Sequence, residues 1–294
     1  MEKDNTIYRI DYPVFNLGAR PFFYGLFYLL KEHKTNSFKL VRHIFADYFA
    51  TQFKRTPLIY IDTAIDKEIL PKPGVLGIYL GFIPFLVGSL GFLIKEYRNE
   101  ANDDIDGIIT SLIDFYSDTG FIFSNAQTTF INRKTKGFGL ALLHLFDRPR
   151  NYFPSLHVVL VSYVYYKVCQ IINKYPGNLT GREMIKDYLS KRATGIIESC
   201  ILTKQHGVRD IAGGLAFISS QDKEFKDQIA PMLIDSIFSE HYFGMENDLI
   251  QRVKSEIRAL YVDIMSYVAK EKYNDYNYKQ GFVDYVKSID FRKA

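Results

Sequence analysis

The chain has 294 residues, with 37 Lys and Arg against 33 Asp and Glu, and a formal net charge of +4 at pH 7. A charge balance this mild, without a compact basic stripe, argues against a nucleic-acid partner. The two cysteines, Cys169 and Cys200, stand in apolar segments without a CxxC spacing, so neither a disulfide framework nor a zinc site is indicated. The aromatic content is high, with 22 Tyr and 24 Phe, and it favours contact with a membrane.

The N-terminal stretch MEKDNTIYRIDY is mixed in charge, so we expect no cleavable signal peptide and any membrane insertion through a retained helix. The strongest apolar run extends from Val75 to Ile94 and contains twenty residues without a charge. At a rise of about 1.5 Å per residue, such a helix matches the hydrocarbon thickness of a bilayer. The run predicts a transmembrane helix, with a kink at Pro84 and a small-residue face at Gly77 and Gly81. The alternative is a buried helix of a soluble domain.

Further apolar runs are shorter or are interrupted by an ionisable residue. They are Val14 to Leu30, Leu156 to Asn173, Ala193 to Thr203 and Ile211 to Ser220. Each fits either a span whose polar residue faces an active site or a helix of a soluble bundle. The mean hydropathy of −0.09 weighs against a full set of spans, although much of the polarity lies outside these runs.

The chain becomes charged and amphipathic from about Gln221 onward. Leu249, Val253, Ile257 and Leu260 recur at helical spacing in this region, whereas strand-like alternation is scarce throughout the sequence. We therefore predict an all-α protein. Residues 1–220 are expected to form a membrane-embedded helical bundle, and residues 221–294 a soluble amphipathic helical appendage.

Two polar residues, Ser155 and His157, follow Pro154 at the mouth of an apolar run in RNYFPSLHVVLV. Proline suits the first turn of a helix. A helix that starts there would direct its free backbone amides and the positive end of its dipole toward Ser155 and His157, which favours an anion. Taken alone, the string is equally typical of a helix-start serine beside a hydrogen-bonded histidine.

A second polar cluster lies in SCILTKQHGVRDIAGG, residues 199–214. His206 and Asp210 are four residues apart, so on a helix both side chains would share a face. A carboxylate in that position holds one ring nitrogen of the imidazole and leaves the other directed at a substrate. Lys204 adds a cation. The alternative is a plain surface contact along a helix.

The two clusters, in this order and about fifty residues apart, resemble the type-2 phosphatidic acid phosphatase superfamily. FPSLHV and TKQHxxxDxAG are most similar to its inositol phosphorylceramide synthase branch, over roughly Phe121 to Ser220. The resemblance implies that His206 attacks phosphorus and forms a phosphohistidine, that Asp210 orients it, and that His157 protonates the leaving alkoxide. Phosphoryl transfer needs such a nucleophile and proton donor, with positive charge around the phosphate oxygens. Ser155 and nearby amides would hold those oxygens, and no metal or other cofactor is required.

The sequence departs from the family pattern at two places. Cys200 stands where many phosphatase members have an arginine, and Lys204 is expected to supply the missing charge. The family's first motif, a lysine followed at a distance by Arg-Pro, is not cleanly present. The literal match at Arg148 lies too close to the next motif, so Arg133 or Lys136 in INRKTKG is the better candidate for phosphate binding. Each of these basic residues fits a solvated or headgroup-facing charge equally well.

The leading hypothesis is a lipid phosphatase or phosphotransferase, integral to the membrane, that acts on a phosphorylated lipid through a phosphohistidine. Water or an alcohol such as inositol would resolve that intermediate. The alternatives are a phosphatase for a soluble phosphate ester or diphosphate, and a degenerate, non-catalytic membrane scaffold. The sequence leaves the oligomeric state open. We expect the imidazoles of His157 and His206 to face one cavity and to flank a single phosphate.

Overall fold

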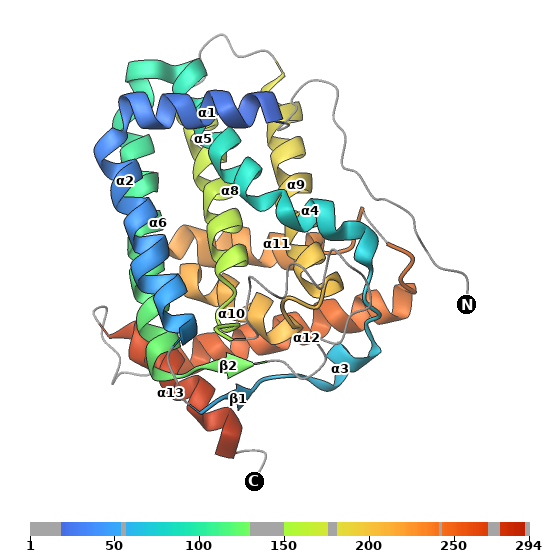
Figure 1. Ribbon diagram of the computed structural model, residues 1–294. Coiled ribbons are helices and arrows are strands. Elements are labelled where there is room, and N and C mark those ends of the chain that lie inside the picture. Colours follow the sequence, from blue (N-terminus) through green and yellow to red (C-terminus); the bar gives the residue numbers. More distant parts are fainter. Residues whose placement is uncertain are drawn as a thin grey trace.

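The computed structural model describes residues 19–53, 57–129, 150–175, 181–240, 243–269 and 277–291 (Figure 1). It is mostly helical, with 81% helix and 2% strand, which confirms the predicted all-α class. The elements before residue 130 are α1 (Ala19–Glu32), α2 (Lys34–His43), η1 (Ile44–Phe49), η2 (Ala50–Phe53), β1 (Ile59–Tyr60), α3 (Ala64–Glu68), η3 (Pro73–Val75), α4 (Leu76–Leu80), α5 (Phe82–Tyr97), η4 (Arg98–Ala101), α6 (Asn102–Asn125) and β2 (Thr128–Thr129). The elements after it are α8 (Leu156–Lys174), α9 (Arg182–Leu202), α10 (Val208–Ser219), η5 (Phe225–Ile229), α11 (Ala230–Ser236), α12 (Asn247–Val268) and α13 (Tyr278–Phe291).

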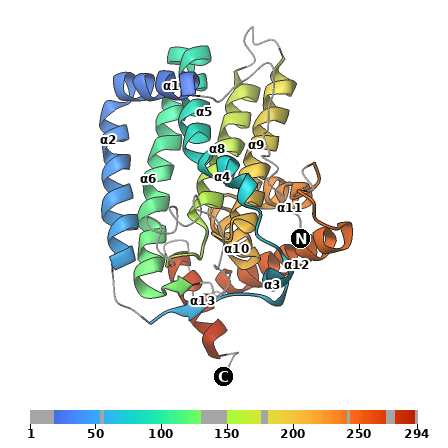
Figure 2. The ribbon, with the colours of Figure 1, turned by 45° about the vertical axis from the view of Figure 1, so that its right-hand side comes forward.

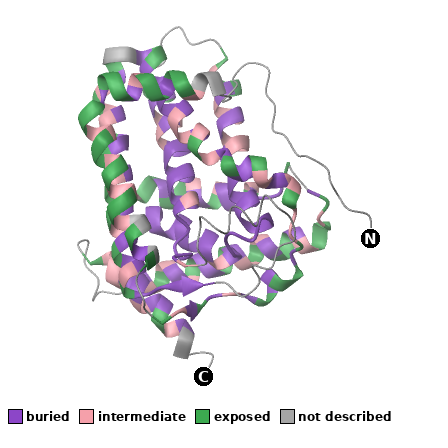
Figure 3. Ribbon diagram, viewed as in Figure 1, coloured by how far each residue is buried: buried purple, intermediate pink, exposed green. Residues whose placement is uncertain are grey.

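Helix α8 is the central helix of the bundle and packs against α5, α6, α9 and α10. Most of its residues are buried on every side, as Figure 3 shows by its purple colour. A helix that is apolar all round needs such an environment. Lys167, a charged residue in the second half of the helix, pairs with Asp222 at 3.1 Å. The apolar run that begins at Leu156 therefore forms the core of the bundle.

One helical segment in the described part of the chain, Pro73–Tyr97, is long and apolar enough to cross a membrane. Half of its most apolar stretch is buried inside the protein. A core helix of a soluble protein can be equally long and apolar. The segment breaks at Gly81, between α4 and α5. This position fits Pro84, which has no N–H to donate to the carbonyl of Leu80. Membrane embedding thus stays a proposal.

Of the predicted small-residue face at Gly77 and Gly81, one residue contacts a neighbouring helix. A Cβ on Gly81 would lie 3.0 Å from Nη2 of Arg192 on α9, so this glycine allows α4 to approach α9 closely. A Cβ on Gly77 would meet nothing within 4 Å. Gly81 alone of the pair therefore serves helix packing.

The C-terminal helices share the core of the preceding bundle. Val253, Ile257 and Leu260 are buried on α12 and Leu249 is partly buried, as expected for an amphipathic helix. Helix α12 packs on α10, and α13 packs on α6, α12 and β1. Both Figure 1 and the turned view in Figure 2 place α12 and α13 at the end of the bundle where α8 begins. The core runs without a break across residue 220.

Candidate active site at the start of α8

Ser155 is the N-cap of α8 rather than a residue within its first turn. The sequence predicted a helix beginning at Pro154, but the helix begins at Leu156. The physical reason is that the Ser155 Oγ accepts a hydrogen bond from the amide of Val158 at 3.4 Å, which satisfies one of the free donors at the helix end. Ser155 is fully buried. Its binding of phosphate oxygens stays a prediction.

His157 and His206 come together although they are far apart in the sequence. Nδ1 of His157 lies 3.3 Å from Nε2 of His206. The expectation that the rings flank a phosphate is not met in this structure. A phosphate between two nitrogen atoms, with a hydrogen-bond distance on each side, would hold them roughly 5–6 Å apart. The two rings instead contact each other directly, and a phosphate would have to separate them.

Asp210 lies behind His206, on the side away from His157. Its Oδ2 is 3.6 Å from Nδ1 of His206 and accepts a hydrogen bond from the amide of Gly207 at 2.8 Å. His206 precedes α10 and Asp210 lies in its first turn, so the two do not share a helix face as the spacing suggested. The spacing instead reflects a cap, in which the carboxylate bonds to the amide that opens the helix.

The arrangement favours one proton distribution. The Asp210 carboxylate stabilises a proton on Nδ1 of His206, which leaves a lone pair on Nε2 and makes Nδ1 of His157 the donor between the rings. Burial lowers the pKa of His157 well below 6.5, and the neighbouring His206 lowers it further. Burial raises the pKa of Asp210 and the Gly207 amide opposes that rise. The imidazole of His157 is therefore neutral.

Aromatic rings that the sequence did not single out form the walls of the site. Tyr79 and Phe82 pack on the His157 ring with centroid distances of 4.8 and 4.4 Å. Tyr152 meets the His206 ring edge-on at 5.5 Å. Since Tyr79 and Phe82 belong to α4 and α5, the most apolar segment of the chain borders the site. Aromatic residues are so common in this sequence that no spacing marked these three.

Two glycines after Asp210 bring the motifs into contact. A Cβ on Gly213 would lie 2.3 Å from the Phe153 ring, and a Cβ on Gly214 would lie 2.9 Å from the carbonyl oxygen of Ser155. The amide of Ser155 in turn donates to the carbonyl of Asp210 at 3.2 Å. Close packing of the two motifs therefore requires small residues at Gly213 and Gly214. The AGG string of the second motif was the sequence feature that could have predicted this contact.

Of the basic residues predicted to bind phosphate, the structure describes Lys204, whose ammonium group bonds to a backbone carbonyl. Lys204 is buried with a positive φ of 58°, and its Nζ donates to the backbone carbonyl of Asp66 at 2.7 Å. Burial lowers the pKa of Lys204 to about 8. Its role in phosphate binding stays a prediction, as does that of Arg133, which lies outside the described residues together with Lys136 and Arg148. Cys200 is fully buried at the position of the family's arginine.

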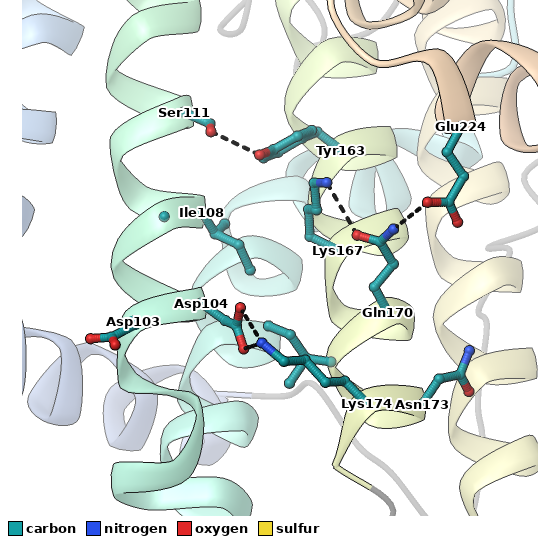
Figure 4. Close-up of a pocket in the computed structure, with 12 residues that line it drawn as sticks. Asp103, Asp104, Ile108, Ser111, Tyr163, Lys167, Gln170, Asn173, Lys174 and Glu224 are labelled. Atoms are coloured by element: carbon teal, nitrogen blue, oxygen red, sulfur yellow. Dashed lines mark hydrogen bonds and ion pairs between the residues drawn. The ribbon is translucent and has the colours of Figure 1, made fainter.

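Two cavities in the described structure lie away from these residues. The larger, of about 620 Å³, is lined by α6, α8 and Glu224, and ion pairs such as Lys174 with Asp104 cross it (Figure 4). The smaller, of about 290 Å³, lies between α1 and α5, beside Asn102. Of the predicted site residues that the structure describes, none lines either cavity. Within the described residues, no group of three or more His, Cys, Asp or Glu is arranged to hold a metal ion.

No protein-family model, curated protein or solved structure matches this chain. The family resemblance therefore rests on the two sequence motifs, and its implications for function are proposals. The geometry adds one physical point to those motifs: His157, His206 and Asp210 form a continuous line of contacts at the start of α8.

Proposed function

We propose that the protein is a lipid phosphatase or phosphotransferase that works through a phosphohistidine on His206. The observation that supports this proposal is the line of three side chains, with Nδ1 of His157 3.3 Å from Nε2 of His206 and Asp210 3.6 Å behind the second ring. A nucleophile, a proton donor and an orienting carboxylate are the groups that such a reaction needs.

The proposed reaction has two steps. In the first, His157 takes up a proton as the phosphate binds. Nε2 of His206 then attacks phosphorus, the P–N bond forms as the P–O bond breaks, and the His157 imidazolium donates that proton to the leaving alkoxide. The Asp210 carboxylate stabilises the positive charge that develops on the phosphorylated ring. In the second step, water or an alcohol attacks phosphorus, His157 accepts its proton, and the P–N bond breaks. The free amides at the start of α8 favour the phosphate charge during both steps.

We also propose that the protein is integral to a membrane. Pro73–Tyr97 supports this, since Leu80 and Ile83 are exposed beside the aromatic residues that contact His157. Large apolar side chains are also exposed along η1 and along α1 and α2, which are largely green in Figure 3. They are Phe23, Tyr24, Leu26, Phe27, Leu30, Phe38, Val41 and Phe45. Extended apolar surface of this kind is rare on monomeric soluble proteins and typical of contact with lipid or a partner.

The proposed activity is tested with purified protein and a panel of phosphatidic acid, prenyl diphosphate and a soluble aryl phosphate. We expect phosphate release or transfer from the lipid substrates and an acid-labile, alkali-stable phosphoryl label on the protein. His206→Ala removes the nucleophile, so it should abolish the label and lower turnover at least about a thousandfold. His43→Ala, on α2, is the matched control and should retain both. A label that persists in His206→Ala would contradict the assignment of the nucleophile.

A second candidate is a non-catalytic membrane scaffold. The direct contact between the imidazoles, the buried Cys200 and the bond from Lys204 to Asp66 favour it. Vanadate separates the two candidates because it adopts the trigonal bipyramidal geometry of phosphoryl transfer. Binding of vanadate that is lost in His206→Ala supports the enzyme. A wild-type protein that neither binds vanadate nor acquires a phosphoryl label supports the scaffold.

A further inference from the structure

Helix α13 reaches the candidate active site through two fully buried aromatic residues, Phe282 and Tyr285. The ring of Tyr285 is stacked on that of Phe153, with a centroid distance of 5.6 Å and an interplanar angle of 30°. The ring of Phe282 also contacts that of Phe153, with a centroid distance of 6.1 Å and an interplanar angle of 43°. Phe153 comes directly before Pro154 and Ser155, so α13 supports the segment that begins α8.

The hydroxyl of Tyr285 contacts the second motif. Nη1 of Arg209 donates to the Tyr285 Oη at 2.8 Å, and Nε of Arg209 donates to the carbonyl of Ile61 at 3.2 Å. A hydrogen bond from a guanidinium is stronger than one between neutral groups. Arg209 is the residue before Asp210, so the bond fixes the backbone that carries the orienting carboxylate.

We infer that Tyr285 is a positioning residue for the phosphohistidine chemistry, a role that depends on the function proposed above. One side chain contacts both motifs, its ring on the α8 side and its hydroxyl on the α10 side. The separation of those two helix starts sets the distance from His157 to His206. A displacement of about 1 Å in such a geometry is enough to lower a rate about a hundredfold.

The chemistry of the side chain supports this role over simple core packing. Phe282, one helical turn earlier, fills the same core with a plain phenyl ring. Tyr285 buries a hydroxyl in addition, and an unpaired hydroxyl in that place would be costly. The hydroxyl has a defined use because the Arg209 guanidinium lies 2.8 Å away. Tyr267 on α12 contacts the Tyr285 ring edge-on at 5.7 Å and belongs to the same aromatic cluster, which makes it a matched control.

Tyr285→Phe keeps the stacked ring and removes the bond to Arg209. We expect kcat to fall about tenfold or more with little change in KM, and the pH profile of kcat to shift, because the carboxylate behind His206 is less well placed. Tyr267→Phe should leave kcat and its pH profile unchanged. Arg209→Lys, a second variant that keeps the charge, should lose a similar factor. In the double variant the losses should not multiply, since both changes remove the same bond.

A measurement that does not depend on enzymatic turnover distinguishes the positioning role of Tyr285 from the proposed function. The ring protons of His157 and His206 are followed by NMR over a pH titration in the wild type and in both tyrosine variants. Tyr285→Phe should shift the His206 resonance and its titration midpoint, while Tyr267→Phe should not. If the Tyr285→Phe titration superimposes on that of the wild type, the positioning role is wrong. If the resonance shifts but the wild type has no activity on any phosphoester, only the proposed function fails. A variant that loses thermal stability while kcat and both resonances stay unchanged would show a merely structural role.

Discussion

The surroundings of His157 keep its imidazole neutral. Tyr79 and Phe82 cover the ring at centroid distances of 4.8 and 4.4 Å, so water cannot solvate an added proton well. Nδ1 faces Nε2 of His206 at 3.3 Å, and a second imidazole at this distance also disfavours a positive charge. A phosphate dianion between the rings would reverse both effects, because it would attract the proton that His157 must donate. The general acid is thus expected to become charged only when substrate is bound.

A titration of His157 by NMR tests this electrostatic account. Burial and His206 both lower its pKa, so the midpoint in the substrate-free protein should lie below 6.5. In His206→Gln one of the two causes is removed, and the midpoint should rise toward the usual value. Addition of vanadate to the wild type should raise it as well. A midpoint at or above 6.5 in the substrate-free wild type would be inconsistent with a desolvated ring.

The same lowered pKa predicts how stability depends on pH. His157 stays neutral in the folded chain while the unfolded chain binds a proton below 6.5, so its contribution to stability is complete above that pH and is lost as pH falls toward the lowered native pKa. The loss amounts to about 1.4 kcal/mol for each unit of pKa difference. Urea unfolding from about pH 7.5 to about pH 5.5 measures it. His157→Gln should flatten the slope, and an equal slope in the two proteins would exclude His157 as its source.

Much of the site could be predicted at the residue scale, because a histidine and a carboxylate with a fixed spacing leave a pattern in the sequence. His157, His206 and Asp210 do meet, as the pattern predicted. The contact of Tyr79, Phe82 and Tyr152 with the imidazoles left no pattern, since ring packing depends on the tertiary fold alone. The bond from Lys204 to Asp66 could not be predicted either, because it joins residues 138 positions apart and involves a backbone carbonyl.

At the scale of helices, the approach of α10 to the start of α8 depends on a missing side chain. Gly213→Ala would place a Cβ 2.3 Å from the Phe153 ring, which is held by Phe282 and Tyr285. We expect a loss of about 1–3 kcal/mol in the free energy of unfolding, typical of overpacking, and a larger relative loss of activity. Urea denaturation measures the first effect and the phosphoryl label the second.

Gly107→Ala on α6 is the control for Gly213→Ala. A Cβ at Gly107 would meet nothing within 4 Å, so the change should be neutral or stabilise the helix by up to about 1 kcal/mol. If Gly213→Ala is as stable and as active as Gly107→Ala, the close packing of the two motifs contributes to neither stability nor activity.

The helix starts show where a pattern was assigned to the wrong local structure. The spacing of four between His206 and Asp210 fits a helix face and also a cap, and hydrophobic periodicity does not distinguish the two. Gly207 decides the matter, because it opens α10 and donates its amide to the Asp210 carboxylate at 2.8 Å. The uncharged run from Val75 to Ile94, by contrast, predicted a helix with a kink at Pro84. The break at Gly81 agrees with it, because Pro84 cannot donate a hydrogen bond to the carbonyl of Leu80.

At the scale of the whole molecule, residues 221–294 were expected to form an appendage because their composition is charged. Composition describes the solvent-facing side of α12 and α13, while the buried side of these helices fills the common core with residues such as Phe282 and Tyr285. We therefore expect the full chain to unfold in one cooperative transition, followed by far-UV circular dichroism and tyrosine fluorescence. A truncated chain of residues 1–220 should lack a cooperative transition. Two separate transitions in the full chain would instead support independent domains.

The outer surface of α1 carries the most direct test of the membrane proposal. Phe23 and Phe27 are one helical turn apart and are 65% and 61% exposed, which would be costly in water over such an area but favourable in lipid. Burial of a phenylalanine side chain contributes about 1.5–3 kcal/mol, so Phe23→Asp with Phe27→Asp should weaken binding to phospholipid vesicles at least about tenfold. Flotation with vesicles after removal of detergent measures the bound fraction. Val262→Asp, at a 55% exposed position on α12, is the matched control and should float as the wild type does. Equal losses in both variants would mean that general charge repulsion, rather than α1, determines binding, and a wild type that stays in solution would exclude a membrane location for the phosphoester chemistry.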